Sequence, residues 1–178
     1  MKLSERFTQC GSDKNTIHSY GEFYDDLSSR LPANPTILEI GVYEGHSLKA
    51  LMDHFPSGRI IGVDKDIRPR YRRRRGLEVL QCTTPDYAPL IVQMKRLGLR
   101  FDVIIDDGSH HLADQSQGVI CLSQFLSDSG IYIIEDLQNE EAIERFQNMS
   151  FRVIDLRHVK GRVDDILAVA SSHKCSSI

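Results

Sequence analysis

The order of apolar segments along the chain constrains its fold more than any other feature. Short apolar runs with strand character alternate with stretches whose apolar residues recur at helical spacing. One such helical face combines Leu48, Leu51, Met52 and Phe55. The strand-like runs span residues 36–42, 59–64, 77–82, 101–106, 130–136, 151–159 and 165–171. Strands that alternate with helices in this way predict an α/β fold.

Most of the strand-like runs are almost continuously apolar, which is typical of strands buried on both faces of a sheet. We therefore expect a three-layer sandwich, in which helices cover both faces of a mostly parallel sheet with right-handed crossovers. The last two runs differ, because the Gly-containing link between them is too short for a crossover helix. They are expected to pair as an antiparallel hairpin. Gly98 and Gly130 are expected at helix ends, just before the next strand.

Length and composition indicate one ordinary globular domain. The chain has 178 residues, of which 40% are hydrophobic and 26% charged, with a formal net charge of -3. We expect a single domain over 1–178, with an N-terminal helical or lid segment (1–34) and a core (35–178). The sequence shows neither a membrane-length apolar stretch nor a signal peptide, and its four cysteines lack metal-type spacing. The expectation is a cytoplasmic protein with no membrane partner.

Two motifs follow the first two strand-like runs, where the carboxyl ends of parallel strands would form a ligand site. The first run ends in Glu39-x-Gly41-x-x-x-Gly45 before a helical stretch, and the second ends in Asp64. The glycines alone could form a simple strand-to-helix turn, and Asp64 alone could be a solvated cap. An acid about 20 residues after a glycine turn is the arrangement that binds ribose hydroxyls, so the pair favours a nucleoside-type ligand.

With these motifs in place, residues 36–171 resemble the class I S-adenosylmethionine-dependent methyltransferases. The stretches "DDGSHH", "YIIEDL" and "GSDKNTIHSYGEFYDDL" are similar to the metal-dependent O-methyltransferases of macrolide-sugar and cephalosporin-pathway type. The resemblance implies a Rossmann-like, seven-stranded sheet with the last strand antiparallel. It also implies S-adenosyl-L-methionine as methyl donor and a bound Mg²⁺.

The expected cofactor contacts combine the two motifs with positions that the resemblance supplies. His18 and Tyr20 would be ordinary surface residues in most proteins, but the resemblance suggests that they help to cover the cofactor. The sequence departs from the family pattern at Tyr43, where a second glycine is usual, and at Cys82, where an acid is common. The full expected set is Glu39, Gly41, Gly45, Asp64, Cys82, Thr83, Asp106, His18 and Tyr20.

Four acids at the ends of two strands predict a metal site. If the strands are adjacent, these carboxylates converge and repel one another unless a hard divalent cation such as Mg²⁺ binds them. The expected ligands are Asp106, Asp107, Glu135 and Asp136. Beside the metal, Asp107 and His110 are the expected catalytic residues, with His110 as general base. The alternative is that "DD" is only a helix N-cap; His111 is expected at the surface, in a lid or near the substrate.

An arginine-rich segment, "RPRYRRRRG" at 68–76, follows the second strand-like run. Its ordinary interpretation is a solvated loop. Alternatively, Arg72 and Arg74 bind an anionic substrate, or the segment binds RNA backbone with Tyr71 available for stacking.

Three functional hypotheses remain. The first is Mg-assisted O-methylation of a hydroxyl on a small molecule, such as a sugar or natural product, by a chain that could form a homo-oligomer. The second is a nucleic-acid methyltransferase that uses the arginine segment, and the third is a non-catalytic nucleotide-binding module. The set of acids favours the first hypothesis, and an anionic or polyhydroxylated small-molecule acceptor is expected rather than nucleic acid.

Overall fold

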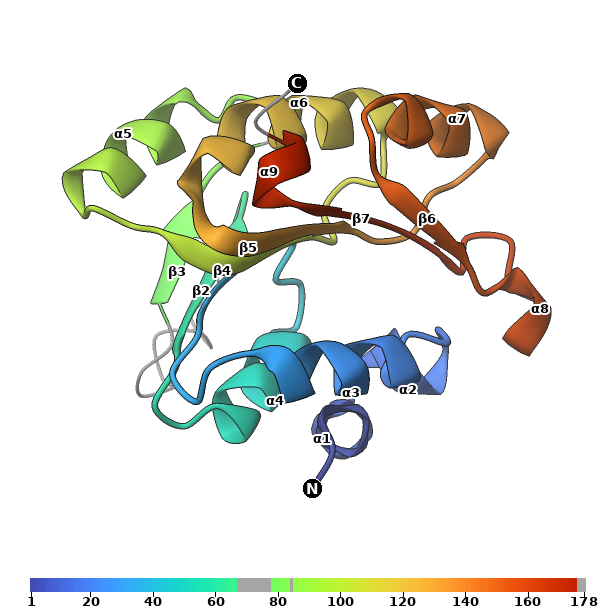
Figure 1. Ribbon diagram of the computed structural model, residues 1–178. Coiled ribbons are helices and arrows are strands. Elements are labelled where there is room, and N and C mark those ends of the chain that lie inside the picture. The colour runs from blue at the N-terminus through green and yellow to red at the C-terminus, as the bar shows by residue number, and fades with distance from the viewer. Residues whose placement is uncertain (67–77, 84, 176–178) are drawn as a thin grey trace.

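The computed structural model describes residues 1–66, 78–83 and 85–175, and these form a three-layer α/β sandwich (Figure 1). The strands are β1 (Thr36–Ile40), β2 (Arg59–Asp64), β3 (Glu78–Gln81), β4 (Phe101–Asp106), β5 (Leu126–Ile134), β6 (Arg152–Asp155) and β7 (Ile166–Ser171). The helices are α1 (Leu3–Cys10), α2 (Asp13–Thr16), α3 (Gly21–Arg30), α4 (His46–His54), α5 (Ala88–Arg96), α6 (Leu112–Leu122), α7 (Glu140–Asn148), α8 (Arg157–Lys160) and α9 (Ser172–Cys175). A 3₁₀ turn, η2 (Ser123–Phe125), joins α6 to β5.

The strand order is β3-β2-β1-β4-β5-β7-β6. Among the described strands, β7 is antiparallel to both of its neighbours, β5 and β6, and every other pair is parallel. The predicted seven-stranded, mostly parallel sheet with an antiparallel last strand is therefore confirmed. The hairpin of β6 and β7 is confirmed too, although its link contains the short helix α8. Chain order reverses between β1 and β4, and this switch point is where a sheet of this kind binds ligands.

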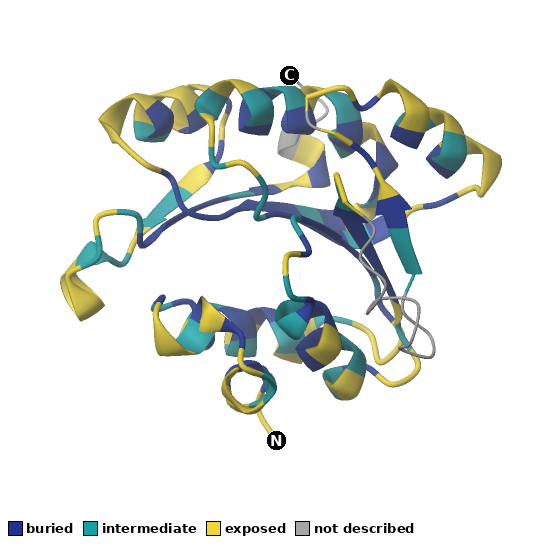
Figure 2. Cartoon of the chain, turned by 180° about the vertical axis from the view of Figure 1, so that it is seen from behind, coloured by how far each residue is buried: buried dark blue, intermediate teal, exposed yellow. Residues whose placement is uncertain are grey.

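Both faces of the sheet are buried, which explains why the strand sequences are almost continuously apolar (Figure 2). Along β1, Ile37 packs in the core beneath α1, α3 and α4, whereas Leu38 packs in the opposite core beneath α5, α6 and α7. In β4, Ile104 and Ile105 divide between the two cores in the same way. Side-chain alternation along each strand therefore decides which layer a residue meets.

The first 34 residues form part of the helical layer on one face of the sheet. Phe7 and Tyr24 stack edge to face, with ring centroids 5.3 Å apart, and share a core with β1 and β4. Figure 1 shows α1, α2 and α3 beside α4 on this face. Among the described residues, no helix is long and apolar enough to cross a membrane.

Gly130 is not at a helix end, so that prediction was wrong. It lies inside β5, which begins at Leu126 directly after η2. A side chain at Gly130 would place its Cβ 2.8 Å from the backbone oxygen of Phe101 in the neighbouring strand. The glycine therefore permits close strand pairing at the register shift between Phe101 and Val103. Gly98, by contrast, follows α5 with a φ of +60°, as expected.

Gly41 controls how closely the ends of β1 and β4 approach each other. It has a φ of +89°, and a Cβ at this position would lie 2.0 Å from the backbone oxygen of Asp107. The amide of Asp107 in turn donates to the carbonyl of Ile40 at 2.9 Å. Only glycine satisfies both the conformation and the contact. The Glu-x-Gly motif therefore brings the side chains that follow β1 and β4 to one edge of the sheet.

This contact predicts a large difference between two glycine substitutions. Gly41→Ala should lower the free energy of unfolding by at least about 3 kcal/mol, because the added Cβ overlaps backbone that cannot move freely. Gly98→Ala is the matched control, since Gly98 also has a positive φ but has no atom within 4 Å of the Cβ position. It should cost only about 1 kcal/mol. Urea unfolding of both variants is the measurement, and equal costs would contradict this account of Gly41.

Candidate functional site

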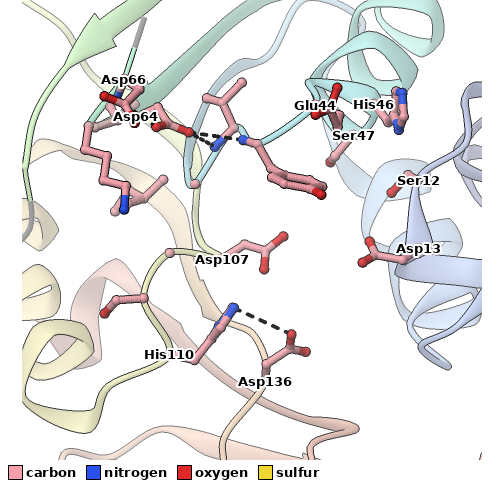
Figure 3. A pocket seen from close by; sticks show the side chains of 18 of the residues that line it. Ser12, Asp13, Glu44, His46, Ser47, Asp64, Asp66, Asp107, His110 and Asp136 are labelled. Atoms are coloured by element: carbon pink, nitrogen blue, oxygen red, sulfur yellow. Dashed lines mark hydrogen bonds and ion pairs between the residues drawn. The ribbon is translucent and has the colours of Figure 1, made fainter. Parts of the chain in front are cut away.

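A cavity of about 1010 Å³ opens at the carboxyl ends of the strands, around the switch point between β1 and β4. This volume is at the upper end for small-molecule sites. In Figure 3, Asp64 lies on one side of the cavity, Ser12 and Asp13 of the N-terminal segment lie opposite, and Asp107 lies between them. Seven of the predicted site residues line the cavity: Gly41, Asp64, Cys82, Thr83, Asp107, His110 and Asp136.

The Asp64 carboxylate is fixed by backbone amides. Its Oδ2 accepts hydrogen bonds from the amides of Val42 and Tyr43, at 2.9 and 3.0 Å, and its Oδ1 accepts one from Asp66 at 3.0 Å (Figure 3). A carboxylate has about four acceptor positions, and three are used here, so the Asp64 carboxylate can still accept a hydrogen bond from one ligand hydroxyl. The acid at the end of β2 and the turn after β1 thus form one rigid unit.

The turn after β1 keeps a glycine-like backbone despite its sequence. Tyr43, at the position where the resemblance implied a glycine, adopts a φ of +46°, and Gly45 follows with a φ of +72° as the N-cap of α4. A left-handed conformation costs a non-glycine residue about 1–2 kcal/mol. The Tyr43 side chain is 72% exposed, and the residue lines the cavity. Tyr43 therefore adds a side chain to the wall of the cavity while its backbone keeps the left-handed conformation.

On the other side of the cavity, Asp107, His110 and Asp136 form a group that could hold a metal ion. One ligand atom from each lies within 4.8 Å of the others, and His110 Nε2 is 4.0 Å from Asp136 Oδ2 (Figure 3). His110 and Asp136 both have left-handed backbones, with φ of +57° and +56°. His110 Nδ1 is buried and has no hydrogen-bond partner in the described part of the chain. Two carboxylates and an imidazole suit a divalent cation, and such strain is typical of functional sites.

Lys14 is the site residue that the sequence prediction missed. Its side chain is only 1% exposed, and its Nζ lies 2.6 Å from Asp107 Oδ2, 2.5 Å from Glu135 Oε2 and 3.3 Å from Glu39 Oε1. One ammonium group thus contacts carboxylates that follow β4 and β5 and one within β1. The converging acids in the sequence indicated that a cation was needed, but the sequence did not show that Lys14 of the same chain supplies one.

Three aromatic residues of the N-terminal segment pack against Glu135 and Asp136 on the side away from the cavity. The Tyr20 hydroxyl donates to Asp136 Oδ1 at 2.5 Å, and the Tyr24 hydroxyl donates to Glu135. His18 stacks on Tyr20, and its Nδ1 lies 3.3 Å from Asp136 Oδ1. His18 and Tyr20 are therefore buried against the candidate metal group, where the Tyr20 hydrogen bond orients Asp136. Neither residue lines the cavity, and their role in covering a cofactor stays a prediction.

Burial and mutual repulsion raise the pKa values of the clustered acids. Burial raises the pKa of Glu135 well above its usual value, against the opposing charge of Lys14. Burial and the charge of Asp107 raise the pKa of Asp136, although the Tyr20 hydrogen bond opposes the shift. Burial works to lower the pKa of Lys14, but the charges of Asp107, Glu135 and Glu39 hold it well above its usual value. Lys14 is thus a permanent cation in an excess of negative charge.

Asp106 lies outside the candidate metal group of Asp107, His110 and Asp136 and does not line the cavity, so its role as a ligand of metal and cofactor stays a prediction. Successive side chains alternate across the sheet, so Asp106 and Asp107 point in different directions. Asp106 is 2% exposed and lies beneath α6, where a Cβ at Gly118 would be 2.8 Å from its Oδ2. Burial raises the pKa of Asp106 to about 7, against a backbone hydrogen bond from Gly108.

The remaining predicted residues take other positions. Glu39 is buried behind the cavity, where it accepts a hydrogen bond from Ser47 at 2.6 Å and pairs with Lys14. Glu135 faces Lys14 and Tyr24, on the buried side of the cluster. His111 is exposed at the N-cap of α6. Arg72 and Arg74 lie outside the described residues.

Comparisons with known proteins agree with this geometry. No family model matches the chain. It is 33% identical over 132 residues to 8-demethyl-8-(2-methoxy-alpha-L-rhamnosyl)-tetracenomycin-C 3'-O-methyltransferase of Streptomyces olivaceus, covering 67% of this chain and 32% of that protein. It is 35% identical over 138 residues to L-olivosyl-oleandolide 3-O-methyltransferase of Streptomyces antibioticus, covering 70% and 34%. The chain therefore spans about a third of the length of these curated relatives.

Among solved structures, the chain is similar in fold to the MycE methyltransferase of the mycinamycin biosynthetic pathway in complex with Mg and SAH. The TM-score is 0.74 at 22% identity, over 96% of this chain and 55% of that one. Fold, site and sequence together show that the chain belongs to the class I S-adenosylmethionine-dependent methyltransferases. Within that class it is related to the sugar O-methyltransferases of natural-product pathways.

Proposed function

We propose that this chain forms the donor-binding and metal-binding unit of an O-methyltransferase that acts on a sugar hydroxyl of a natural product. The observation that carries the proposal is that one cavity joins the nucleoside-type side, at Gly41 and Asp64, to the Asp107–His110–Asp136 group. The relatives that share its sequence methylate hydroxyls of rhamnosyl and olivosyl groups, as their names state. The acceptor is proposed to be a small polyhydroxylated molecule of this kind.

The two ends of the cavity are proposed to have different functions, with the donor bound at one end and the metal ion and acceptor at the other. Asp64 would accept a hydrogen bond from a ribose hydroxyl of S-adenosylmethionine. Cys82 and Thr83 line the cavity beside Asp64, where they would contact the adenine. S-adenosylmethionine supplies the methyl group when it is bound. Gly41 has no side chain, so only backbone lies where the donor end of the cavity meets the end with Asp107, His110 and Asp136. Positioning an acceptor oxygen against the donor accounts for much of the rate gain in a transfer of this kind.

Asp107 and Asp136 are the proposed metal ligands, and His110 lies beside them without binding the metal. When Mg²⁺ is bound, it lowers the pKa of a coordinated hydroxyl and fixes its position. Tyr20 and His18 would keep Asp136 oriented toward the cavity. His110, which lines the cavity, would accept the proton that leaves the acceptor hydroxyl.

Nucleic-acid methylation is less well supported, because it depends on the arginine segment, which lies outside the described residues. A non-catalytic binding module does not require His110 and Asp136 to keep strained backbones beside Asp107. A role for Arg72 and Arg74 in binding an anionic acceptor, and a homo-oligomeric assembly, stay predictions.

The donor assignment predicts the effect of removing one carboxylate. Asp64→Ala should weaken S-adenosylhomocysteine binding by about 1.5–3 kcal/mol, because a charged hydrogen bond to the ribose is lost. Asp128→Ala serves as the control, since Asp128 is an exposed acid of β5. Isothermal titration calorimetry measures both. Unchanged affinity in Asp64→Ala, or preferential binding of NAD by the wild-type chain, would contradict the assignment.

The metal assignment predicts that EDTA abolishes methyl transfer to a rhamnosylated or olivosylated acceptor and that Mg²⁺ or Mn²⁺ restores it. His110→Ala should lower turnover by about 10²–10⁴-fold, the usual contribution of a general base, while Mn²⁺ affinity changes less than tenfold. His158→Ala, at an exposed position of α8, is the control. Turnover is measured with labelled S-adenosylmethionine. Full activity in EDTA would count against the metal, and full activity of His110→Ala would count against the base.

A further inference from the structure

The acid cluster at the strand ends has two sides, which differ in their access to the cavity. Glu39 and Glu135 are each 1% exposed and lie on the buried side, against the N-terminal helices. Asp107 has a side-chain exposure of 23% and lines the cavity together with Asp136. Asp107 therefore belongs to both sides, and a cation could approach it from either.

Lys14 already occupies the buried side. Its ammonium group lies 2.5–3.3 Å from one oxygen each of Glu39, Asp107 and Glu135. Tyr24 adds a contact from the same direction, with the Lys14 Nζ 6.0 Å from its ring centroid. These are hydrogen-bonding distances for an ammonium group, and they leave no space for a second cation among the same three oxygens.

A divalent cation on the buried side would serve no acceptor, because Lys14, Glu39 and Glu135 are almost completely shielded from solvent. Three carboxylates at one point would nevertheless attract such an ion strongly, since oxygen-rich acidic sites suit Mg²⁺ and Mn²⁺. If only Asp107 and Asp136 bind the metal ion, some group must therefore keep the ion out of the buried side of the cluster.

We propose that Lys14 is this group. It is a positioning residue whose ammonium group occupies the buried side of the cluster and confines the metal ion to the cavity side of Asp107. The inference rests on the proposed function, because it presupposes a divalent cation beside Asp107, His110 and Asp136. Lys14 pairs with Asp107 through Oδ2, so the metal would use the other oxygen of the same carboxylate. Lys14 thereby sets both the location of the ion and an upper limit on its affinity.

Because Lys14 is charged, its removal should change metal affinity in a direction that a purely structural role would not produce. An ammonium group and a divalent cation on the same carboxylate repel each other, and the repulsion is strong where solvent is excluded. Removal of the ammonium should therefore tighten metal binding. If Lys14 only supported the fold, its removal would loosen Asp107 and weaken metal binding or leave it unchanged.

The experiment is a Mn²⁺ titration of the full chain, followed by electron paramagnetic resonance of the free ion, with S-adenosylhomocysteine binding as a check on folding. Lys14→Met should bind Mn²⁺ at least about tenfold more tightly than the wild type, whereas Lys14→Arg, which keeps the charge, should not. Lys49→Met is the matched control, because Lys49 pairs with Asp53 on the surface of α4, and it should bind Mn²⁺ as the wild type does.

Lys14→Met leaves three acids without their counterion, so its unfolding temperature is measured with and without Mn²⁺, and Mn²⁺ should raise it more than in the wild type. The double variant Lys14→Met/Glu135→Gln restores the charge of the cluster and should return Mn²⁺ affinity to within about threefold of wild type. Equal or weaker binding by folded Lys14→Met, or a loss above tenfold in the double variant, overturns the inference. Wild-type protein that binds S-adenosylhomocysteine but no Mn²⁺ would overturn the proposed metal centre as well.

Discussion

The ion cluster around Lys14 is the interaction on which the rest of the site depends. A parallel sheet directs the carboxyl ends of its strands to one edge, and here that edge collects Glu39, Asp107 and Glu135 within reach of one ammonium group. Without a cation these acids could not all stay ionised in a buried position. Because Lys14 belongs to α2, the same contact that balances the charge also fixes the N-terminal segment against the sheet.

Close backbone approach and local strain complete the arrangement. Gly41 lets the end of β1 meet the backbone of Asp107, and the left-handed residues His110 and Asp136 turn their side chains toward the same point. Such conformations persist only where the surroundings fix them. Tyr20 donates a hydrogen bond to Asp136 Oδ1, and His18 stacks on Tyr20. The cavity thus has one wall of rigid backbone and one of strained, anchored side chains.

Much of this could be predicted from sequence, because strand periodicity and strand-end acids obey local rules. The continuous apolar runs predicted a sheet buried on both faces, and Asp64 and Asp107 lie, as expected, at the carboxyl ends of the strands, where they line the cavity. The rest depended on tertiary contacts. Neighbouring acids such as Asp106 and Asp107 could not be assigned to opposite faces without the exact end of β4, and Lys14 lies 93 residues from Asp107 in the chain. Gly130 was predicted at a helix end because its actual role, close contact with Phe101 in the neighbouring strand, depends on a residue that is distant in the sequence.

The central claim is that this edge of the sheet holds a methyl donor and one divalent cation in a single cavity. Diffraction from crystals grown with S-adenosylhomocysteine and Mn²⁺ tests both parts at once, because anomalous scattering locates the metal independently of the protein atoms. The account predicts the ribose at Asp64 and one Mn²⁺ peak within ligand distance of Asp107 and Asp136, with Lys14 still paired to Glu135. A peak between Glu39 and Glu135, or a cavity that holds neither ligand, would contradict it.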